Sequence, residues 1–174
     1  MKRLLPFLLL GATAPVQAAD TLHQIYIQPS FTNLKIDGSH GSGLMNQVGY
    51  NYNFTPILSA DLSYYMTTSI KDIATNSDEA SATGATAAIK MSFPMSYYGS
   101  FYGKTGLNRT VLSYKDVYNG HTSKQESTSI KPFVSVGTTM QLLPFVTFNI
   151  EYQYIPLASD DYMSAIGAGV NVMF

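Results

Sequence analysis

The chain of 174 residues contains no cysteine and no tryptophan, and only 12% of its residues are charged. Without cysteine it has no disulfide framework, no thiol nucleophile and no acylated cysteine as a lipid anchor. The charged fraction is about half of ordinary usage. Because the formal net charge is −1, the chain lacks the basic surplus that nucleic-acid binding requires.

Long hydrophobic runs are also missing. Beyond the N-terminal stretch, no segment approaches the roughly 18 consecutive apolar residues of a membrane helix. Hydrophobic residues nevertheless reach 45% of the chain, which has 13 tyrosines and 9 phenylalanines. Dispersed hydrophobicity with many aromatics and few charges is typical of a sheet with one face in lipid.

The N-terminus has the features of an export signal. A basic pair precedes an apolar run at 4–14, and Val16 and Ala18 are small residues where a signal peptidase reads the chain. We predict a signal peptide over 1–18, cleaved after Ala18 or after the next residue, and one domain over 19–174.

The last twelve residues alternate in character. Read backwards in steps of two, the apolar set is Val172, Val170, Ala168 and Ile166. The residues between them are small or polar, apart from Met173. This period of two predicts a strand, and its aromatic end, Phe174, suits a strand that closes a β-barrel.

Seven earlier segments alternate in a similar way. We expect strands at 24–36, 44–54, 58–70, 82–93, about 97–112, 128–140, 146–154 and 163–174. The alternation in the first segment slips after Phe31, and Pro29 cannot donate to a sheet ladder. We therefore predict a bulge over 29–33, which would place Leu34 and Ile36 on the apolar face.

The connections between these segments are of two kinds. Three are short and contain Pro56, Pro94 or Pro144. Four are longer and mostly polar, at 37–43, 71–81, 114–127 and 157–161. Short turns at one end and long loops at the other indicate an all-β fold, an eight-stranded antiparallel up-and-down transmembrane β-barrel with its turns in the periplasm.

The polar faces of the strands carry sparse charges near mid-strand. These are Asp61, Lys90, Lys104, Lys131 and Glu151, with Lys35 joining them if the bulge exists. A soluble barrel would carry many more charges on its outer face, so we assign them to a narrow interior that side chains fill. Since buried ions need partners, we expect the pairs Asp61–Lys90 and Lys131–Glu151. A gated ion pathway is the alternative role.

The segment 148–154 and the glycine-rich last strand ending in Phe174 resemble the small outer-membrane β-barrel superfamily, which includes the OmpA membrane domain, OmpX and the Ail-type adhesins. The resemblance implies that the barrel-assembly machinery reads Val170, Val172 and Phe174. It also implies outer-membrane lipids and lipopolysaccharide as surroundings. Against the full-length OmpA pattern, we expect this chain to lack a periplasmic peptidoglycan-binding domain after the barrel.

One segment is a candidate for a catalytic site. The segment His121-Thr122-Ser123, with Glu126 nearby, has the His-x-Ser spacing of outer-membrane lipid A deacylases. Lys124 stands where those enzymes have asparagine, and a catalytic triad needs a fixed geometry that a loop does not supply. We expect no catalytic residues, no metal site and no cofactor.

Aromatic residues at strand ends are candidates for the two interfacial girdles. On the turn side these are Phe54, Phe93, Phe145 and Phe174, and on the loop side Tyr64, Tyr65, Tyr154 and Tyr162. In the third long loop, Lys115, His121 and Lys124 form a candidate binding surface for lipopolysaccharide phosphates or a host polyanion.

These features predict a non-enzymatic, monomeric integral protein of the bacterial outer membrane with a packed polar interior. Its role would be envelope integrity or surface interaction through the loops. Two alternatives remain open: a narrow channel for ions or small solutes, and a surface adhesin that acts through the loop 114–127.

Overall fold

The computed structural model describes residues 22–36, 39–68, 79–96, 98–118, 121–157 and 161–174. Within them the chain forms the strands β1 (His23–Ile36), β2 (Ser39–Asn53), β3 (Leu58–Thr67), β4 (Glu79–Ser96), β5 (Gly99–Tyr118), β6 (His121–Leu143), β7 (Val146–Pro156) and β8 (Tyr162–Met173). This part of the chain has no helix long and apolar enough to cross a membrane. The expected signal peptide lies outside these residues.

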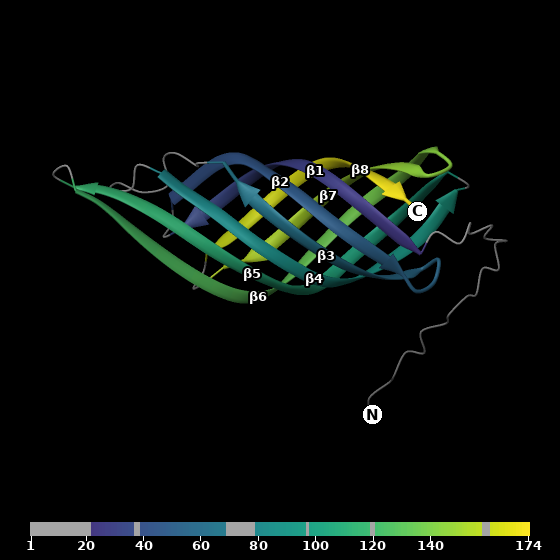
Figure 1. Cartoon of the computed structure of the whole chain (residues 1–174), viewed down its shortest axis with the longest axis horizontal. Coiled ribbons are helices and arrows are strands. Elements are labelled where there is room, and N and C mark those ends of the chain that lie inside the picture. Colours follow the sequence, from purple (N-terminus) through teal and green to yellow (C-terminus); the bar gives the residue numbers. More distant parts are fainter. Residues whose placement is uncertain (1–21, 37–38, 69–78, 97, 119–120, 158–160) are drawn as a thin grey trace, which may run out of the picture.

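The strands form one closed barrel in which each pairs antiparallel with its neighbours in sequence (Figure 1). The β1–β8 seam completes the closure, with Ile25 opposite Val172 and Ile27 opposite Val170. At the end of the seam the backbone N–H of Phe174 donates to the carbonyl of His23 at 3.0 Å. Because every strand has two partners, the backbone is satisfied as a spanning sheet in lipid requires. The predicted fold class is confirmed.

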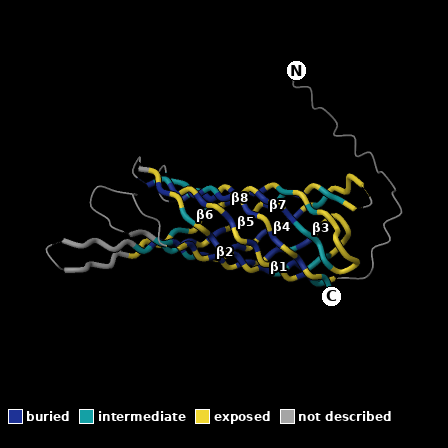
Figure 2. The backbone as a smooth tube through the Cα atoms, turned by 90° about the horizontal axis from the view of Figure 1, so that it is seen from above, coloured by how far each residue is buried: buried dark blue, intermediate teal, exposed yellow. Residues whose placement is uncertain are grey.

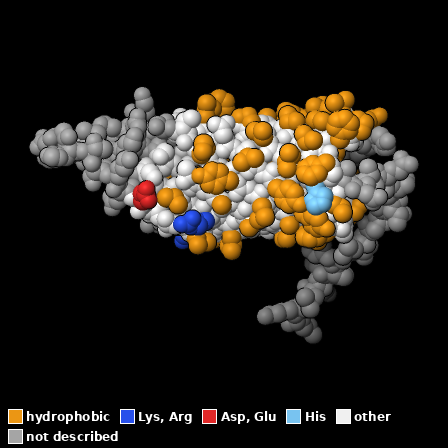
Figure 3. All heavy atoms as spheres, viewed as in Figure 1, with side chains coloured by type: hydrophobic (Ala, Val, Ile, Leu, Met, Phe, Trp, Pro, Cys, Tyr) orange, Lys and Arg blue, Asp and Glu red, His pale blue; other side chains and the backbone are white. Residues whose placement is uncertain are grey.

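Exposed and buried residues alternate along each strand (Figure 2). The outward set is apolar along the middle of the strands, for example Ile27 at 66% and Phe31 at 72% exposure. Figure 3 shows hydrophobic side chains spread over the barrel wall, with the charged ones on this face nearer the end where β5 and β6 project. An apolar belt with charges near one rim is the arrangement of a barrel in a bilayer.

The predicted bulge in β1 is wrong. The β1–β2 register runs without a shift from His23 to Ile36, so Pro29 simply faces outward. Leu34 and Ile36 therefore point into the barrel, where they are 0% and 6% exposed, and Lys35 lies on the outer side. The alternation slips in the sequence because the interior itself becomes apolar there. Register shifts occur elsewhere, between Pro94 and Ser96 and at Gln141/Leu143.

The interior holds an apolar cluster at the end of the barrel away from the short turns, which we call the loop end. We name the cluster the plug. All eight strands contribute to it, through Leu34, Ile36, Met45, Tyr65, Ala82, Leu112, Phe133, Ile155, Leu157, Met163 and Ala165, and the cluster reaches Ala88, the register partner of Asp61. Tyr65 is 0% exposed, so its predicted place in the outer girdle is wrong.

Three of the expected long loops are shorter than predicted because strands extend into them. β2 already begins at Ser39 and β4 at Glu79. The segment 114–127 continues β5 and β6 as a hairpin in which Tyr118 pairs with His121. Figure 1 shows this hairpin projecting beyond the other strands. Above the membrane neither face of a strand must be apolar, so these extensions have no hydrophobic period to reveal them.

Candidate functional site

The centre of the lumen is an ion triad. The Lys104 ammonium on β5 lies 3.1 Å from an Asp61 oxygen on β3 and 3.0 Å from a Glu151 oxygen on β7. The three side chains are 4%, 1% and 1% exposed. One strand lies between Lys104 and each carboxylate, and β3 and β7 lie on opposite sides of the barrel, so the triad spans it from wall to wall. The ammonium pairs with both carboxylates in a site where an isolated ion is costly, and the triad keeps a formal net charge of −1.

Two tyrosines complete the shell of the triad. The Tyr26 hydroxyl donates to Asp61 at 3.1 Å, and the Tyr102 hydroxyl donates to Glu151 at 2.7 Å. The Lys104 ammonium lies 4.8 Å from the Tyr26 ring centroid and 5.6 Å from that of Tyr102. Charge-assisted hydrogen bonds and cation–π contacts both favour the charged forms of these groups.

Each interior tyrosine has room because a glycine faces it across the ladder. Tyr26 pairs with Gly49, Tyr65 with Gly84 and Tyr102 with Gly137. A Cβ added at any of the three glycines would overlap the ring of its partner. The rings therefore lie across the neighbouring strand, where they fill the lumen.

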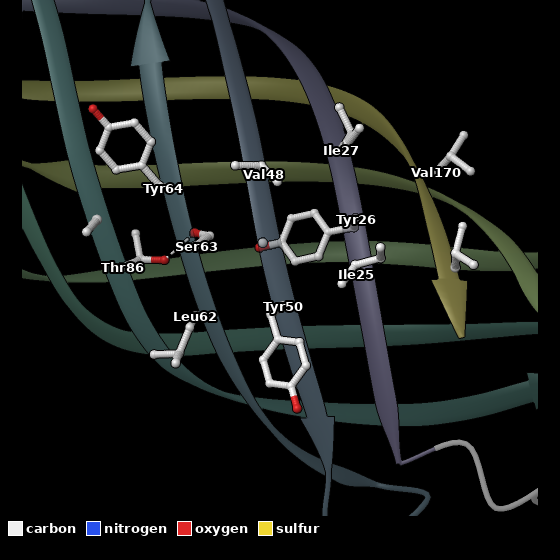
Figure 4. A pocket seen from close by; sticks show the side chains of 13 residues that line it. Ile25, Tyr26, Ile27, Val48, Tyr50, Leu62, Ser63, Tyr64, Thr86 and Val170 are labelled. Atoms are coloured by element: carbon white, nitrogen blue, oxygen red, sulfur yellow. Dashed lines mark hydrogen bonds between the residues drawn. The ribbon is translucent and has the colours of Figure 1, made fainter. Parts of the chain in front are cut away.

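Amide and hydroxyl side chains extend the triad to other strands. Gln153 donates to Glu151 at 3.1 Å and to Gln47 at 2.6 Å. Gln47 in turn donates to Ser63 at 2.7 Å, and Ser63 shares a hydrogen bond with Thr86 (Figure 4). The network thus links β2, β3, β4 and β7 through buried groups, which favours a single arrangement of the interior.

Lys90 lies beside the triad but outside it. It pairs directly with Lys104 across the β4–β5 ladder, and its ammonium lies 4.4 Å from the Tyr102 ring centroid. The predicted Asp61–Lys90 ion pair is absent from the described residues, because Lys104 occupies Asp61 instead. The aromatic face replaces the missing carboxylate.

Lys131 is far from Glu151. Glu151 pairs with Gly137, and Lys131 stands six residues further along β6, about 20 Å away at the usual rise per residue. Lys131 pairs with Asn108, is partly exposed and lies beyond the part of β6 that pairs with β7. The predicted Lys131–Glu151 pair is therefore wrong, because strand adjacency alone does not fix the stagger.

The plug closes the lumen between the triad and the loop end. Within the plug, the Tyr65 hydroxyl bonds to Thr110 at 2.7 Å and to Asn108 at 3.0 Å. An ion entering from the loop end would meet an apolar constriction and then the paired charges of the triad. Apolar constrictions oppose ion passage by excluding water.

The projecting hairpin positions the residues predicted as a surface-binding loop. Lys115 is the register partner of Lys124, and His121 starts β6 opposite Tyr118. The described part of β7 pairs with β6 only from Val134 onward, so the outer edge of β6 over 121–133 has no described strand beside it. The side chains of Lys115, His121 and Lys124 lie outside the described part.

The segment with the His-x-Ser spacing belongs to this hairpin tip. Its backbone is strand, not the loop expected from the sequence, and Ser123 pairs with Asp116. Glu126 is exposed. The described residues bring no group of three or more His, Asp and Glu side chains together for a metal ion.

The residues predicted as an assembly signal line the outside of the seam. Val170, Val172 and Phe174 are 46%, 39% and 61% exposed. The Phe174 ring stacks on His23, with centroids 5.8 Å apart, and His23 Nδ1 is 2.6 Å from the Tyr50 hydroxyl. This aromatic group marks the turn end of the seam.

A groove of about 700 Å³ lies next to this seam on the outer wall (Figure 4). It crosses β8, β1, β2, β3 and β4, and its outward side chains are Ile25, Ile27, Val48, Tyr50, Leu62, Tyr64, Ala85, Val170 and Val172. These side chains are apolar apart from two tyrosine hydroxyls. The groove is thus part of the lipid-facing wall and holds no acid–base pair for catalysis.

An apolar outer belt, a packed polar interior and full antiparallel closure together define a transmembrane β-barrel of the up-and-down class. Residues 5–174 match the family of the outer membrane protein beta-barrel domain. The chain belongs to this family, and its place is the bacterial outer membrane.

Solved structures show the same fold at low sequence identity. Neisserial surface protein A aligns with a TM-score of 0.71 and 17% identity, over 87% of this chain and 97% of the other. Ail, the attachment invasion locus protein of Yersinia pestis, aligns at 0.62 and 18%, with the same coverage. OprG of Pseudomonas aeruginosa aligns at 0.58 and 14%, over 87% and 96%. Among curated proteins, nothing matches this chain.

Sequence reasoning missed the plug and the tyrosine–glycine pairs. Apolar residues of the plug have the hydropathy of lipid-facing ones, so only their phase distinguishes them. The sequence indicates this phase in part, since Met163 lies on the small and polar side of the last strand. The tyrosine–glycine pairs depend on the register between strands, which hydropathy does not encode.

Proposed function

We propose that this chain is a non-enzymatic, monomeric outer-membrane barrel with a closed lumen, which contributes to envelope integrity and interacts with partners at the cell surface through the β5–β6 hairpin. The observation that carries the proposal is the β6 edge over 121–133, which no strand of the described residues pairs with, beyond a lumen filled by the plug and the triad. A filled barrel is a rigid support, and function is then left to what projects from it.

The filled interior favours this role over the alternative of an ion channel. Lys104 pairs with both Asp61 and Glu151, and the plug contains residues from all eight strands. A conducting path would require the plug and the triad to rearrange together. The buried charges are then structural, in that they hold opposite walls of the barrel at a fixed distance.

The edge of β6 over 121–133, which has no partner strand among the described residues, suggests the mode of surface interaction. A strand edge presents unpaired N–H and C=O groups to which an extended polypeptide can add as a further strand. A second mode follows from Lys115 and Lys124, which are register partners and bring two basic residues to one level of the hairpin. The structure of Ail with the heparin analogue sucrose octasulfate has the same barrel fold, with a TM-score of 0.60, which makes a polyanion the second candidate partner.

An adhesion assay with hairpin variants tests the proposal. Residues 115–124 are replaced by a two-residue turn, and a second variant, K115Q/K124Q, keeps the strand edge but removes both charges. We expect cells that carry the shortened barrel to lose binding to host matrix, while heat-modifiable migration on gels shows that the barrel still folds. K115Q/K124Q should retain binding if the edge is used and lose it if a polyanion is bound. Undiminished binding by the shortened barrel would refute the hairpin role.

Export and assembly form a further part of the proposal. Residues 1–18 would act as the cleaved signal peptide, with 19–174 as the barrel. Val170, Val172 and Phe174 would be read by the barrel-assembly machinery, in keeping with their exposure along the closing strand. Mass spectrometry of the mature protein identifies the cleavage site, and a F174S variant should reach the outer membrane in smaller amounts.

A further inference from the structure

The β6 edge contains a palindromic segment. Its seven residues at 122–128 are Thr, Ser, Lys, Gln, Glu, Ser and Thr, so the segment is symmetric about Gln125 apart from the exchange of lysine for glutamate. If it pairs antiparallel with a second copy of itself about this centre, serine lies opposite serine, threonine opposite threonine and each lysine opposite a glutamate. Hydroxyl pairs and opposite charges directly across two strands both stabilise a sheet. The segment is therefore complementary to itself.

The edge is open at this level of the hairpin. Val134 is the first residue of β6 with a partner on β7, namely Tyr154. The N–H of Leu157 donates to the carbonyl of Asp161 at 2.9 Å, which closes the β7–β8 hairpin soon after that level. Gln125 lies further out along β6, about 30 Å from Val134 at the usual rise per residue. Among the described residues, no strand therefore competes for the edge around Gln125.

The charges of the hairpin leave a place for an acid beside this edge. Glu79 on β4 pairs with Lys115 on β5, and Lys115 pairs with Lys124 on β6. Like charges directly opposite destabilise a sheet, and in this row only Lys115 has an acid as its other neighbour. An acid on the open side of Lys124 would give each lysine one acidic neighbour. The symmetric register places Glu126 of a second copy at that position.

We propose that the β6 edge of one copy pairs antiparallel with the β6 edge of a second copy, centred on Gln125 of both. This inference rests on the proposed role of the hairpin in surface interaction and names its partner. The register is specified, because moving the centre to Lys124 or to Glu126 would place like charges directly opposite each other. Pro132, which has no N–H to donate, bounds the paired segment on the side of the barrel.

The symmetry of this pairing determines how the two barrels lie. Adjacent antiparallel strands from two copies of one chain are related by a two-fold axis normal to the sheet. Positions 124 and 126 share one face of the strand, so they also share one face of the joined sheet. A half-turn about an axis normal to the barrel wall points the second barrel in the opposite direction. The two copies therefore lie in two facing membranes, as at a contact between two cells, and not side by side in one membrane.

Charge exchanges at two positions test this register. In K124E both charged positions of the segment are acidic and in E126K both are basic, so each variant repels itself. A mixture of the two variants restores opposite charges in every pair, and the double variant K124E/E126K restores them within one chain. K35E is the matched control, because Lys35 lies on the outer side of β1 and outside the hairpin.

Light scattering of neutral phosphatidylcholine vesicles that carry the full barrel measures the contact, with two dyes to identify mixed clusters. We expect parent vesicles to cluster, and K124E and E126K to associate about tenfold more weakly when each is alone. Their mixture and the double variant should recover the parent level, and K35E should cluster like the parent. Mixed clusters of K35E with E126K should be fewer than those of K124E with E126K, although both mixtures combine one acidic with one basic exchange.

Four results would overturn the proposal: no clustering of parent vesicles, self-association of K124E at the parent level, no recovery in the mixture of K124E with E126K, or equal numbers of mixed clusters with K35E and with K124E. The shortened barrel separates such a failure from the role of the hairpin. If it loses host binding while K124E and E126K cluster like the parent, the hairpin acts on another partner and not on a second copy. Heat-modifiable migration shows that each variant is folded.

Discussion

At the scale of single residues, the packing of the lumen depends on a few charged side chains and on the space that glycines leave for tyrosine rings. Lys104 is the residue on which the network converges, since it contacts Asp61 and Glu151 and lies against the rings of Tyr26 and Tyr102. Removing a group from such a centre leaves its partners buried without compensation. Removing a partly exposed charge, such as that of Lys131, leaves behind only groups that water can solvate.

Lys104→Met should therefore destabilise the barrel by about 3–5 kcal/mol, the usual cost of breaking a buried ion pair from one side. Lys131→Met, at a partly exposed lysine, should cost about 0.5 kcal/mol or less. Urea unfolding in detergent, followed by circular dichroism, measures both. Adding D61N and E151Q to K104M should recover part of the loss; equal stability of K104M and K131M would mean that the triad contributes nothing.

Glycines opposite the interior tyrosines should be sensitive to a single methyl group. Gly137→Ala places a Cβ against the Tyr102 ring and should cost about 1–3 kcal/mol through overpacking. Gly103→Ala is the matched control, because the nearest atom to its Cβ, the Ser135 carbonyl oxygen, is 3.8 Å away. Thermal unfolding in the same detergent compares the two, and the idea fails if Gly103→Ala is the more harmful change.

At the scale of elements, each strand changes its inward character along its length. β1 presents Gln28, Ser30 and Thr32 to the interior before Leu34 and Ile36 enter the plug. On the outside the order is reversed, since the apolar belt gives way to Asn33 and Lys35. The two faces thus exchange polarity near the loop end, because the lumen needs an apolar closure where the wall leaves the lipid.

This change of polarity predicts that a Leu→Ala substitution lowers the free energy of unfolding by different amounts on the inner and outer faces. Leu34→Ala opens a cavity in the plug and should cost about 2–5 kcal/mol. Leu44→Ala, on the lipid-facing wall at 47% exposure, should cost less because detergent or lipid fills the space. Equilibrium unfolding of both variants in the same lipid checks the order, and the reverse order would place Leu34 outside the core.

At the scale of the whole molecule, closure joins the eight alternating strands into one barrel. The β1–β8 seam brings residues near both ends of the described chain into register, and the triad ties β3, β5 and β7 across the lumen. Closed in this way, the barrel faces lipid with its apolar belt and projects its β5–β6 hairpin beyond the other strands.

Closure also predicts the electrical behaviour of the barrel. In planar bilayers the purified protein should show no ohmic steps, because the plug and the triad block the lumen in series. Single-channel recording over a range of voltages is the measurement. Clear ohmic steps that Glu151→Gln abolishes would instead establish a charge-gated pathway through the interior.

Much of the fold could be predicted from the sequence. The number of strands and the inward charges Asp61, Lys104 and Glu151 follow from alternation, because lipid on one face forces a period of two. The phase of β5 was not settled by the sequence. The extended hairpin could not be predicted, since above the bilayer no such constraint acts on β5 and β6. The bulge was predicted wrongly because Leu34 and Ile36 have the hydropathy of lipid-facing residues.

The sequence by itself therefore determined that this protein is a barrel and which residues of the belt face lipid. Only the tertiary structure decided which partners the buried charges take, where the lumen closes and which residues share a row along the β5–β6 hairpin. The physical reason is that hydropathy reports the medium around one residue. Pairing depends on stagger and on contacts across the lumen, as when Lys104 takes both Asp61 and Glu151 and leaves Lys90 to the Tyr102 ring.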